Sequence, residues 1–381
     1  MTPEENARQK IDNLLLQAGW IIQDRDSFDR TAGLGVAVRE FLMADGTEAD
    51  YLLFVDGKAC GVIEAKKAGK TLSGVENQSH GYACHLPDYV KNWQQPLPFV
   101  YESTDNETFF CDGRDKNCRS RRIFAFHSPQ SLLAMLRDSE TLRNRLKQMP
   151  VLEKGSLRDC QFEAIQGLEA SLAQNRQKSL IQMATGAGKT FTACNFSYRL
   201  LKYAQAKRIL FLVDRNNLGK QTKKEFEAFR LPDENRLFPE VYIAQHLQHN
   251  QIDKDAKVVI TTIQRLYSML RGETDYDEKD EEVSAYEIGS LGAPKEVVYN
   301  SQLPPDFFDF IITDECHRSI YGDWRQVLEY FDAFIIGLTA TPSKQTFGYF
   351  NKNVVAEYPY ERSVADGVNV DYQILRIKTE I

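Results

Sequence analysis

Short apolar runs alternate with stretches expected to be helical from residue 178 to residue 342, and this alternation restricts the possible folds more than any other feature. The apolar runs are SLIQM, RILFLV, KVVIT, FDFIIT and FIIGLT. Runs of this kind that alternate with helices pair as parallel strands. We therefore predict an α/β fold with a doubly wound parallel sheet, whose ligands bind at the carboxyl ends of the strands.

A glycine-rich loop follows the first run, in MATGAGKTFT at residues 183–192. Small residues let successive backbone N–H groups turn toward one point, where the N-terminus of the next helix adds its dipole. Lys189 can then reach the β and γ phosphates of ATP, and the Thr190 hydroxyl can ligate Mg²⁺. An ordinary glycine-rich turn is the alternative. The remaining loop residues predicted to bind the nucleotide are Thr185, Gly186, Ala187 and Gly188.

Two acids end a later run, in FIITDECHRS at residues 310–319. A parallel strand would deliver Asp314 to the same edge of the sheet as the loop, where its carboxylate can hold Mg²⁺ through water. Glu315 is placed to orient or deprotonate the attacking water. A strand capped by solvated acids is the alternative, but it leaves the upstream loop unexplained.

The loop is a variant with Met183 where the general motif has glycine, and it resembles the phosphate loop of superfamily 2 helicases and translocases. That resemblance implies that Gln161, in LRDCQFEAI, reads the adenine edge. It also implies that His317 couples ATP hydrolysis to movement, together with Thr339 and Thr341 of LTATP. The stretches LVDRNNLGKQ and ITTIQRL resemble motifs that contact a DNA strand.

A second group of polar residues lies in EADYLLFVDGKACGVIEAKK, residues 48–67. Metal-dependent cleavage of a phosphodiester needs two acidic ligands for Mg²⁺ and a cation near the attacking water. Asp50 and Glu64 are the predicted catalytic and metal-binding acids, and Lys66 is the predicted catalytic cation. They resemble the Asp and E-x-K of PD-(D/E)xK nucleases, without the proline. Gln78 and Tyr82 resemble a Q-x-x-x-Y element of RecB-like nucleases, which implies a DNA-positioning role; a polar face with a packed tyrosine is the alternative.

The turn between the two strands decides whether these acids share a face of the sheet. Opposed residues on antiparallel strands point to the same side. A two-residue turn would pair Val55 with Lys58 and put Asp50 on the wrong side. We therefore predict a three-residue loop with a bulge, which brings Asp50, Glu64 and Lys66 together.

Two long stretches resemble the restriction subunits of type I restriction-modification enzymes. These are ENARQKIDNLLLQAGW near the N-terminus and DECHRSIYGDWRQVLEYFDAFIIGLTATPSKQTFGYFNKNVVAEYPYERSVADGVNVDYQI. The resemblance implies a PD-(D/E)xK endonuclease-like domain over residues 1–150, including a linker, and a first RecA-like lobe over 151–381. It further implies cleavage of double-stranded DNA with Mg²⁺, ATP-driven DNA pumping, and separate methylation and specificity subunits.

The sequence ends directly after the first RecA-like lobe, so we expect a fragment that lacks the second lobe and its arginine finger. An arginine finger typically raises the rate of phosphoryl transfer by about 10³–10⁵. We therefore expect this chain to bind ATP, to hydrolyse little of it, and not to translocate DNA.

The net charge and the cysteines of the chain indicate neither an extended nucleic-acid-binding surface nor a metal site. The net charge is −7, whereas nucleic-acid binding usually leaves a basic footprint. DNA contacts would then depend on local patches, namely Lys66, Lys67 and Lys70, or Arg119, Arg121 and Arg122. The seven cysteines show no metal-ligand spacing and are expected to be reduced. The N-terminus has no apolar signal and no run reaches membrane-spanning length, so we expect a cytoplasmic protein without membrane contact.

Three functional readings remain open from the sequence. The first is the nuclease and motor part of a type I restriction subunit. The second is another superfamily 2 DNA helicase or repair translocase whose N-terminal domain binds DNA without cutting it. The third is a truncated docking module without catalysis, which would tolerate Lys189→Ala and Glu64→Ala.

Overall fold

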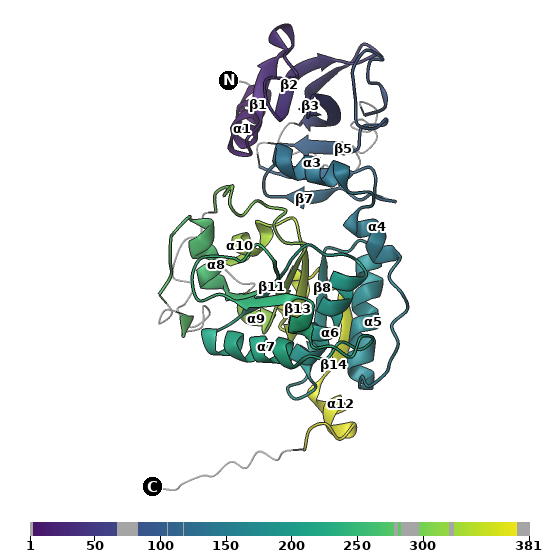
Figure 1. Ribbon diagram of the computed structural model, residues 1–381, viewed down its shortest axis with the longest axis vertical. Helices are drawn as coiled ribbons and strands as arrows, with labels where there is room; N and C mark the ends of the chain where they lie inside the picture. The colour runs from purple at the N-terminus through teal and green to yellow at the C-terminus, as the bar shows by residue number, and fades with distance from the viewer. Residues whose placement is uncertain are drawn as a thin grey trace.

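The computed structural model describes residues 3–66, 83–104, 106–116, 118–277, 281–282, 297–319 and 324–371. These residues form two seven-stranded sheets, one from each half of the chain, and each sheet has its own apolar cores. Figure 1 shows the N-terminal sheet above the C-terminal one. The boundary predicted between residues 150 and 151 falls in the loop that joins α4 (Leu142–Lys147) to α5 (Asp159–Ala173).

The N-terminal sheet is mixed and has the strand order β1-β2-β3-β4-β5-β6-β7. The pairs β1/β2 and β4/β5 are parallel and the others are antiparallel. Ile11, Leu15 and Leu132 bring α1 (Pro3–Gln17) and α3 (Pro129–Arg137) into the core on one face. The strands are β1 (Ile21–Asp24), β2 (Gly35–Leu42), β3 (Glu48–Val55), β4 (Lys58–Ala65), β5 (Phe99–Ser103), β6 (Thr108–Asp112) and β7 (Arg121–Ile123), with the short helix η1 (Arg25–Ser27) after β1.

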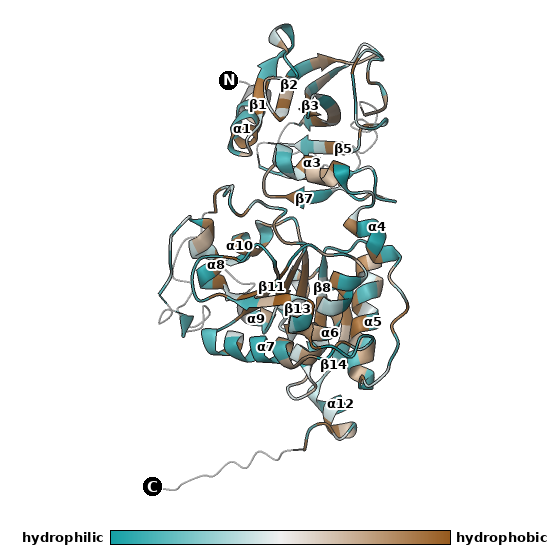
Figure 2. Ribbon diagram, in the orientation of Figure 1, coloured by the Kyte–Doolittle hydropathy of each residue, from teal (hydrophilic) through white to brown (hydrophobic). Residues whose placement is uncertain are grey.

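The C-terminal sheet is parallel throughout, with the order β10-β11-β9-β12-β13-β8-β14. Its central strands are apolar along most of their length because both faces are covered, and Figure 2 draws them largely brown. The strands are β8 (Lys178–Met183), β9 (Ile209–Val213), β10 (Ile243–His246), β11 (Ala256–Thr262), β12 (Phe310–Thr313), β13 (Phe334–Thr339) and β14 (Val354–Tyr358).

Helices cover both faces of this parallel sheet. Leu168, Phe196 and Phe226 bring α5, α6 (Lys189–Lys202) and α7 (Asn216–Ala228) into one core, and Leu266 and Val327 bring α8 (Ile263–Leu270) and α10 (Arg325–Glu329) into the other. The predicted doubly wound α/β fold is therefore confirmed. The shorter helices are α9 (Cys316–Ser319), α11 (Lys344–Tyr349), α12 (Tyr360–Ala365) and η2 (Phe238–Glu240).

A buried ion pair joins the two halves of the molecule. Arg121 of β7 donates two hydrogen bonds, of 2.6 and 2.7 Å, to the carboxylate of Asp332, which precedes β13. His127 Nε2 lies 3.2 Å from the same carboxylate, and the Phe124 ring packs against Tyr330. Burial alone would raise the pKa of Asp332, but the Arg121 charge and these hydrogen bonds hold it far below its usual value. The proposal of Arg121 as part of a DNA-binding patch is therefore wrong.

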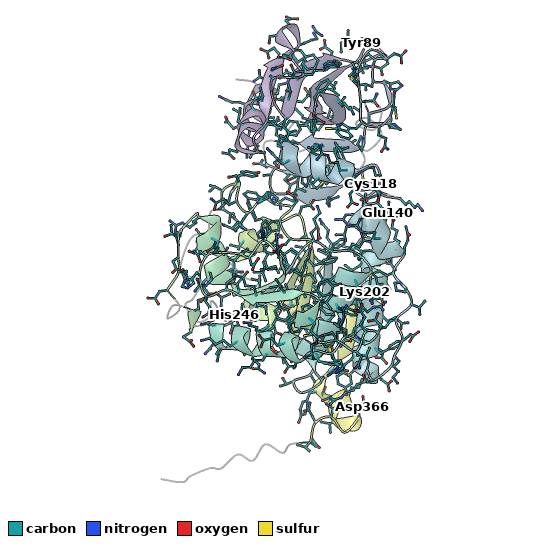
Figure 3. The ribbon with its side chains drawn as sticks, viewed as in Figure 1. Tyr89, Cys118, Glu140, Lys202, His246 and Asp366 are labelled. Carbon is teal, nitrogen blue, oxygen red and sulfur yellow. A yellow bond between two sulfur atoms is a disulfide. The ribbon has the colours of Figure 1, made fainter. Side chains whose placement is uncertain are left out.

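Two other expectations need correction. Cys111 and Cys118 form a disulfide, so the expectation of reduced thiols is wrong for this pair; the other five cysteines are free. Figure 3 labels Cys118 near the junction of the two halves. The acidic stretch at residues 272–290 is poor in core residues, and its composition predicts a surface insertion. Glu281 is instead 1% exposed and accepts hydrogen bonds of 3.0 and 2.8 Å from the buried Arg265, because that guanidinium needs a carboxylate partner.

We predict that Asp332→Asn destabilises the chain strongly. The variant keeps the shape of the side chain but leaves the Arg121 guanidinium buried without its carboxylate, which typically costs about 3–5 kcal/mol. The midpoint of guanidinium denaturation would measure the loss. The matched control is Asp24→Asn, because Asp24 also pairs with an arginine but is 72% exposed and should cost at most about 1 kcal/mol. Equal losses in the two variants would contradict the role of the buried pair.

Candidate functional site

The glycine-rich loop links the end of β8 at Met183 to the start of α6 at Lys189. Gly186 and Gly188 have φ angles of +83° and +86°, a conformation that side chains with a Cβ rarely adopt. Ala184 N–H donates to Tyr358 C=O, which anchors the loop to β14. The loop therefore wraps the N-terminus of a fourteen-residue helix, where backbone N–H groups can receive phosphate oxygens.

Gln161 of α5 holds this loop from behind. Its Nε2 donates to Ala187 C=O at 3.1 Å, and its Oε1 accepts from Arg158 N–H at 3.1 Å. A Cβ added at Gly188 would lie 2.6 Å from Gln161 Nε2. The amide that was predicted to read adenine is thus already bonded to the loop and to the start of α5, so an adenine contact would have to replace one of these bonds.

Lys189 and the two acids after β12 meet at the carboxyl edge of the parallel sheet. Lys189 Nζ lies 3.1 Å from Glu315 Oε1, and Glu315 has a φ of +45°. The pKa of the Asp314 carboxyl is raised to about 6, chiefly by burial and also by the Glu315 charge, while the Lys189 charge opposes the rise. Thr190, the second residue of α6, is half-buried. The Thr185 C=O accepts from Asn369 Nδ2 at 2.9 Å.

The residues predicted to couple hydrolysis to movement form one chain of contacts. His317 Nδ1 lies 3.0 Å from Thr339 Oγ1 and 3.5 Å from Glu315 Oε2. Thr339 Oγ1 also accepts from Thr341 N–H at 3.2 Å. The acid beside Lys189 is thereby connected through His317 to the end of β13, which is the connection that a coupling role requires.

The β3–β4 hairpin brings the N-terminal acids together by a route that the sequence did not predict. Val55 pairs with Lys58 across a two-residue turn, so the predicted three-residue loop is wrong. Cys60, however, is an extra residue between the pairs Phe54↔Ala59 and Leu53↔Gly61. This bulge shifts the register by one residue.

Beyond this bulge the pairing continues to Tyr51↔Ile63, and the same register places Asp50 opposite Glu64. The two acids therefore lie on the same face of the sheet. Lys66, two residues after Glu64, shares that face. The structure thus brings Asp50, Glu64 and Lys66 together through the bulge, not through the turn.

Hydrogen bonds hold each of the three predicted nuclease residues in place. Lys66 Nζ donates to Glu64 Oε1 at 2.8 Å. Asp50 accepts from the Ala65 N–H and from Arg8 of α1, both at 2.8 Å. Among the residues that the structure describes, Glu64 Oε2 is buried and has no hydrogen-bond partner. Burial raises the pKa of Glu64, the Lys66 hydrogen bond lowers it, and the nearby Asp50 charge raises it again.

Glu102 is a third acid at this site that the sequence analysis missed. It is the penultimate residue of β5, lies beside Glu64, its partner in the parallel β4/β5 pair, and is 4% exposed. The signal was present in FVYES, a second apolar run with an acid near its end. This parallel neighbour follows the hairpin only after a long connection, so the hairpin pattern alone does not include it.

The chemistry of the acids fits Mg²⁺, because carboxylate oxygens are its preferred ligands and Glu64 offers a buried oxygen that no described residue hydrogen-bonds. Their arrangement is not yet that of a metal site. Among the residues that the structure describes, no three His, Cys, Asp or Glu side chains gather closely enough to hold a metal ion. Asp50 would have to exchange Arg8 for the ion. Gln78, Tyr82, Lys67 and Lys70 lie outside the described residues.

The fold and the two sites define a protein that joins a mixed sheet with clustered acids to a parallel α/β sheet with a glycine-rich loop of phosphate-binding type. The family model described as "Type III restriction enzyme, res subunit" matches residues 154–344, half of the chain, and the chain belongs to this family. A second model, "Type I restriction enzyme EcoKI endonuclease subunit second domain", matches residues 27–105.

The curated relatives are endonuclease subunits of type I restriction enzymes. The EcoKI subunit of Escherichia coli K12 is 27% identical over 97% of this chain and 35% of its own length. The EcoAI subunit of Escherichia coli is 28% identical over 96% of this chain and 43% of its own length. The resemblance inferred from the sequence is thus confirmed, and the chain spans well under half of these relatives.

A solved fragment assigned to the HsdR subunit of a type I restriction enzyme from Vibrio vulnificus YJ016 is 22% identical. It covers 96% of this chain and 61% of its own length, with a TM-score of 0.39. None of the helices that the structure describes is long and apolar enough to cross a membrane.

We predict that Gly188→Ala abolishes nucleotide binding by this chain. The new methyl group would meet Gln161 Nε2 at 2.6 Å, and the backbone would have to leave its φ of +86°. Titration with a fluorescent ATP analogue measures the effect. The control is Gly46→Ala, because Gly46 has a φ of +84° with nothing within 4 Å of an added Cβ. Normal nucleotide affinity in Gly188→Ala would show that this loop is not the binding site.

Proposed function

We propose that this chain is the nuclease and motor part of a type I restriction endonuclease subunit. Asp50, Glu64 and Lys66 would cut double-stranded DNA with Mg²⁺, and the phosphate loop would bind the ATP that drives DNA pumping. The observation that carries the proposal is the β3–β4 register, which puts these three residues on one face in the same chain as a GKT loop. The methylation and specificity subunits of such an enzyme would be its partners, with the cytoplasm as its location.

The nuclease residues would divide the work as follows. Asp50 and Glu64, with Glu102 beside them, would hold Mg²⁺, which supplies an activated water and neutralises charge on the scissile phosphate when bound. Lys66 orients Glu64 through its 2.8 Å hydrogen bond and can donate to the negative charge that develops during cleavage. The Ala65 N–H fixes the Asp50 carboxylate at 2.8 Å.

In the motor half, Lys189 and the loop N–H groups would bind the β and γ phosphates. Thr185, Gly186, Ala187 and Gly188 would shape the loop, and Gln161 would support it. Thr190 and Asp314 would hold the Mg²⁺ that accompanies the nucleotide, and Glu315 would orient the attacking water. His317 would pass the state of Glu315 to Thr339 and Thr341 through the contacts described above.

Two substitutions should separate the two activities. In the full-length subunit assembled with its methylation and specificity subunits, Glu64→Gln should abolish plasmid cleavage and leave ATPase unchanged. Lys189→Ala should abolish ATPase and, with it, the cleavage that depends on pumping. Glu48→Gln is the matched control, since Glu48 lies on β3 with a side chain 55% exposed. Cleavage that survives Glu64→Gln would favour a DNA-binding domain that does not cut.

We predict that nucleotide binding weakens at acidic pH because the Asp314 carboxylate becomes protonated. Its pKa is raised to about 6, so the carboxylate that would hold Mg²⁺ is lost as the pH falls through about 6. We expect the affinity of this chain for the Mg²⁺-bound ATP analogue to fall over the same range, while the metal-free analogue binds independently of this group. Asp314→Asn should remove this pH dependence. If the affinity of the variant still falls as the pH decreases through about 6, another group is responsible.

A further inference from the structure

A cleft of about 530 Å³ lies between the two halves of the molecule. The N-terminal half contributes residues of α1 and of the β5–β7 region, and the C-terminal half contributes residues around β8, α10 and β13. It lies at the amino ends of β8 and β13, because Lys178 and Ile335 line it. The phosphate loop follows the carboxyl end of β8, so the cleft is separate from the predicted nucleotide site.

Positive charge predominates among the described residues that line this cleft. Four cations line it, Lys10 and Arg122 from the N-terminal half and Lys178 and Arg325 from the other, against two carboxylates, Glu107 and Glu329. The whole chain has a net charge of −7. The cleft therefore gathers cations from both halves against the overall charge, which favours an anionic ligand.

Among the described lining residues, two carboxylates stand against four cations. Glu329 is shared, since Lys178 Nζ and Arg325 Nε each lie 3.0 Å from its Oε1. Burial lowers the pKa of Lys178, Glu329 raises it, and the charges of Arg325 and Arg122 lower it again. Arg122 is 53% exposed and lies 3.5 Å from the half-exposed Glu107. A bound anion would relieve the repulsion among the cations.

The remaining lining residues fit a sugar–phosphate backbone. Phe124, Phe331 and Ile335 supply an apolar floor on which deoxyribose can pack. Hydroxyl and amide side chains, which commonly contact phosphate and sugar, stand around that floor: Thr104, Thr108, Gln177 and Gln326. Thr104 is the second residue after Glu102, so one wall of the cleft begins where the acidic edge of the N-terminal sheet ends.

We propose that this interdomain cleft binds the sugar–phosphate backbone of DNA, with Arg122 and Arg325 contacting phosphates from opposite walls. The proposal rests on the proposed function, because DNA is the polyanion that must reach Glu64 and Glu102. Each half supplies one of the two arginines, so the cleft exists only while the halves stay joined. It would guide the strand toward the acids without taking part in the cleavage step.

The salt dependence of DNA binding tests the cleft. The full-length subunit would be titrated onto a fluorescein-labelled duplex across a series of KCl concentrations, with Ca²⁺ in place of Mg²⁺ and without ATP. Each phosphate contact contributes about 0.9 to the slope of log K against log salt. We therefore expect Arg122→Gln/Arg325→Gln to bind more weakly and to lose about 2 from the magnitude of that slope. A second variant, Lys10→Gln, should lose about 1.

Arg25→Gln is the matched control, because Arg25 is 48% exposed and lies 3.2 Å from the half-exposed Glu48, outside the cleft. It should keep the slope of the wild type. The proposal would be overturned if the double variant and Lys10→Gln kept the wild-type slope, or if Arg25→Gln lost as much slope as they do. It would also be overturned if the double variant lost as much slope when polyglutamate replaced the DNA duplex. If the wild type binds no duplex, the proposed function fails as well. If it binds with a slope that the variants share, only the cleft assignment fails.

Discussion

Parallel pairing in the C-terminal sheet is the constraint on which the proposed nucleotide site depends. Because β8, β12 and β13 run in the same direction, their carboxyl ends meet at one edge. Lys189, Asp314 and Thr339 are far apart in the sequence, yet each follows or ends one of these strands. No local feature of the three segments could bring Lys189 within 3.1 Å of Glu315 or His317 within 3.0 Å of Thr339. The parallel pairing of the strands brings these residues together.

In the N-terminal half, one extra residue has the corresponding role. The side chains of a strand alternate between faces, so a shift of one residue moves every later side chain to the opposite side. Cys60 provides that shift, and Gly61 beside it admits the close approach of β5, since a Cβ there would lie 2.5 Å from Phe99 C=O. The bulge thereby sets Glu64 opposite Asp50 and beside Glu102. The site thus depends on backbone packing at two residues that carry no chemistry.

Buried polar contacts help to hold the two halves together. Arg121 and Asp332 exclude water from each other's charge, and His127 and Ser131 add hydrogen bonds to Asp332 and Asp306. Asp332 immediately precedes Ala333 and Phe334, the start of the strand that ends at Thr339. The interface therefore holds the N-terminal sheet against the amino end of β13, a strand of the C-terminal sheet. The cation-rich cleft lies along the same junction.

The sequence by itself determined the parallel sheet, the phosphate loop and the strands that carry the acids, because these depend on apolar periodicity and on glycine, lysine and threonine at fixed spacing. It also supplied the resemblance that the comparisons confirmed. Only the tertiary structure decided the hairpin register, the place of Glu102 and the burial of Arg121 and Glu281. Register depends on how β4 packs against β5, and burial of an ion pair depends on a partner that is distant in the sequence. A local pattern contains neither kind of information, which is why the predicted loop was wrong although the acids it was meant to align do share a face.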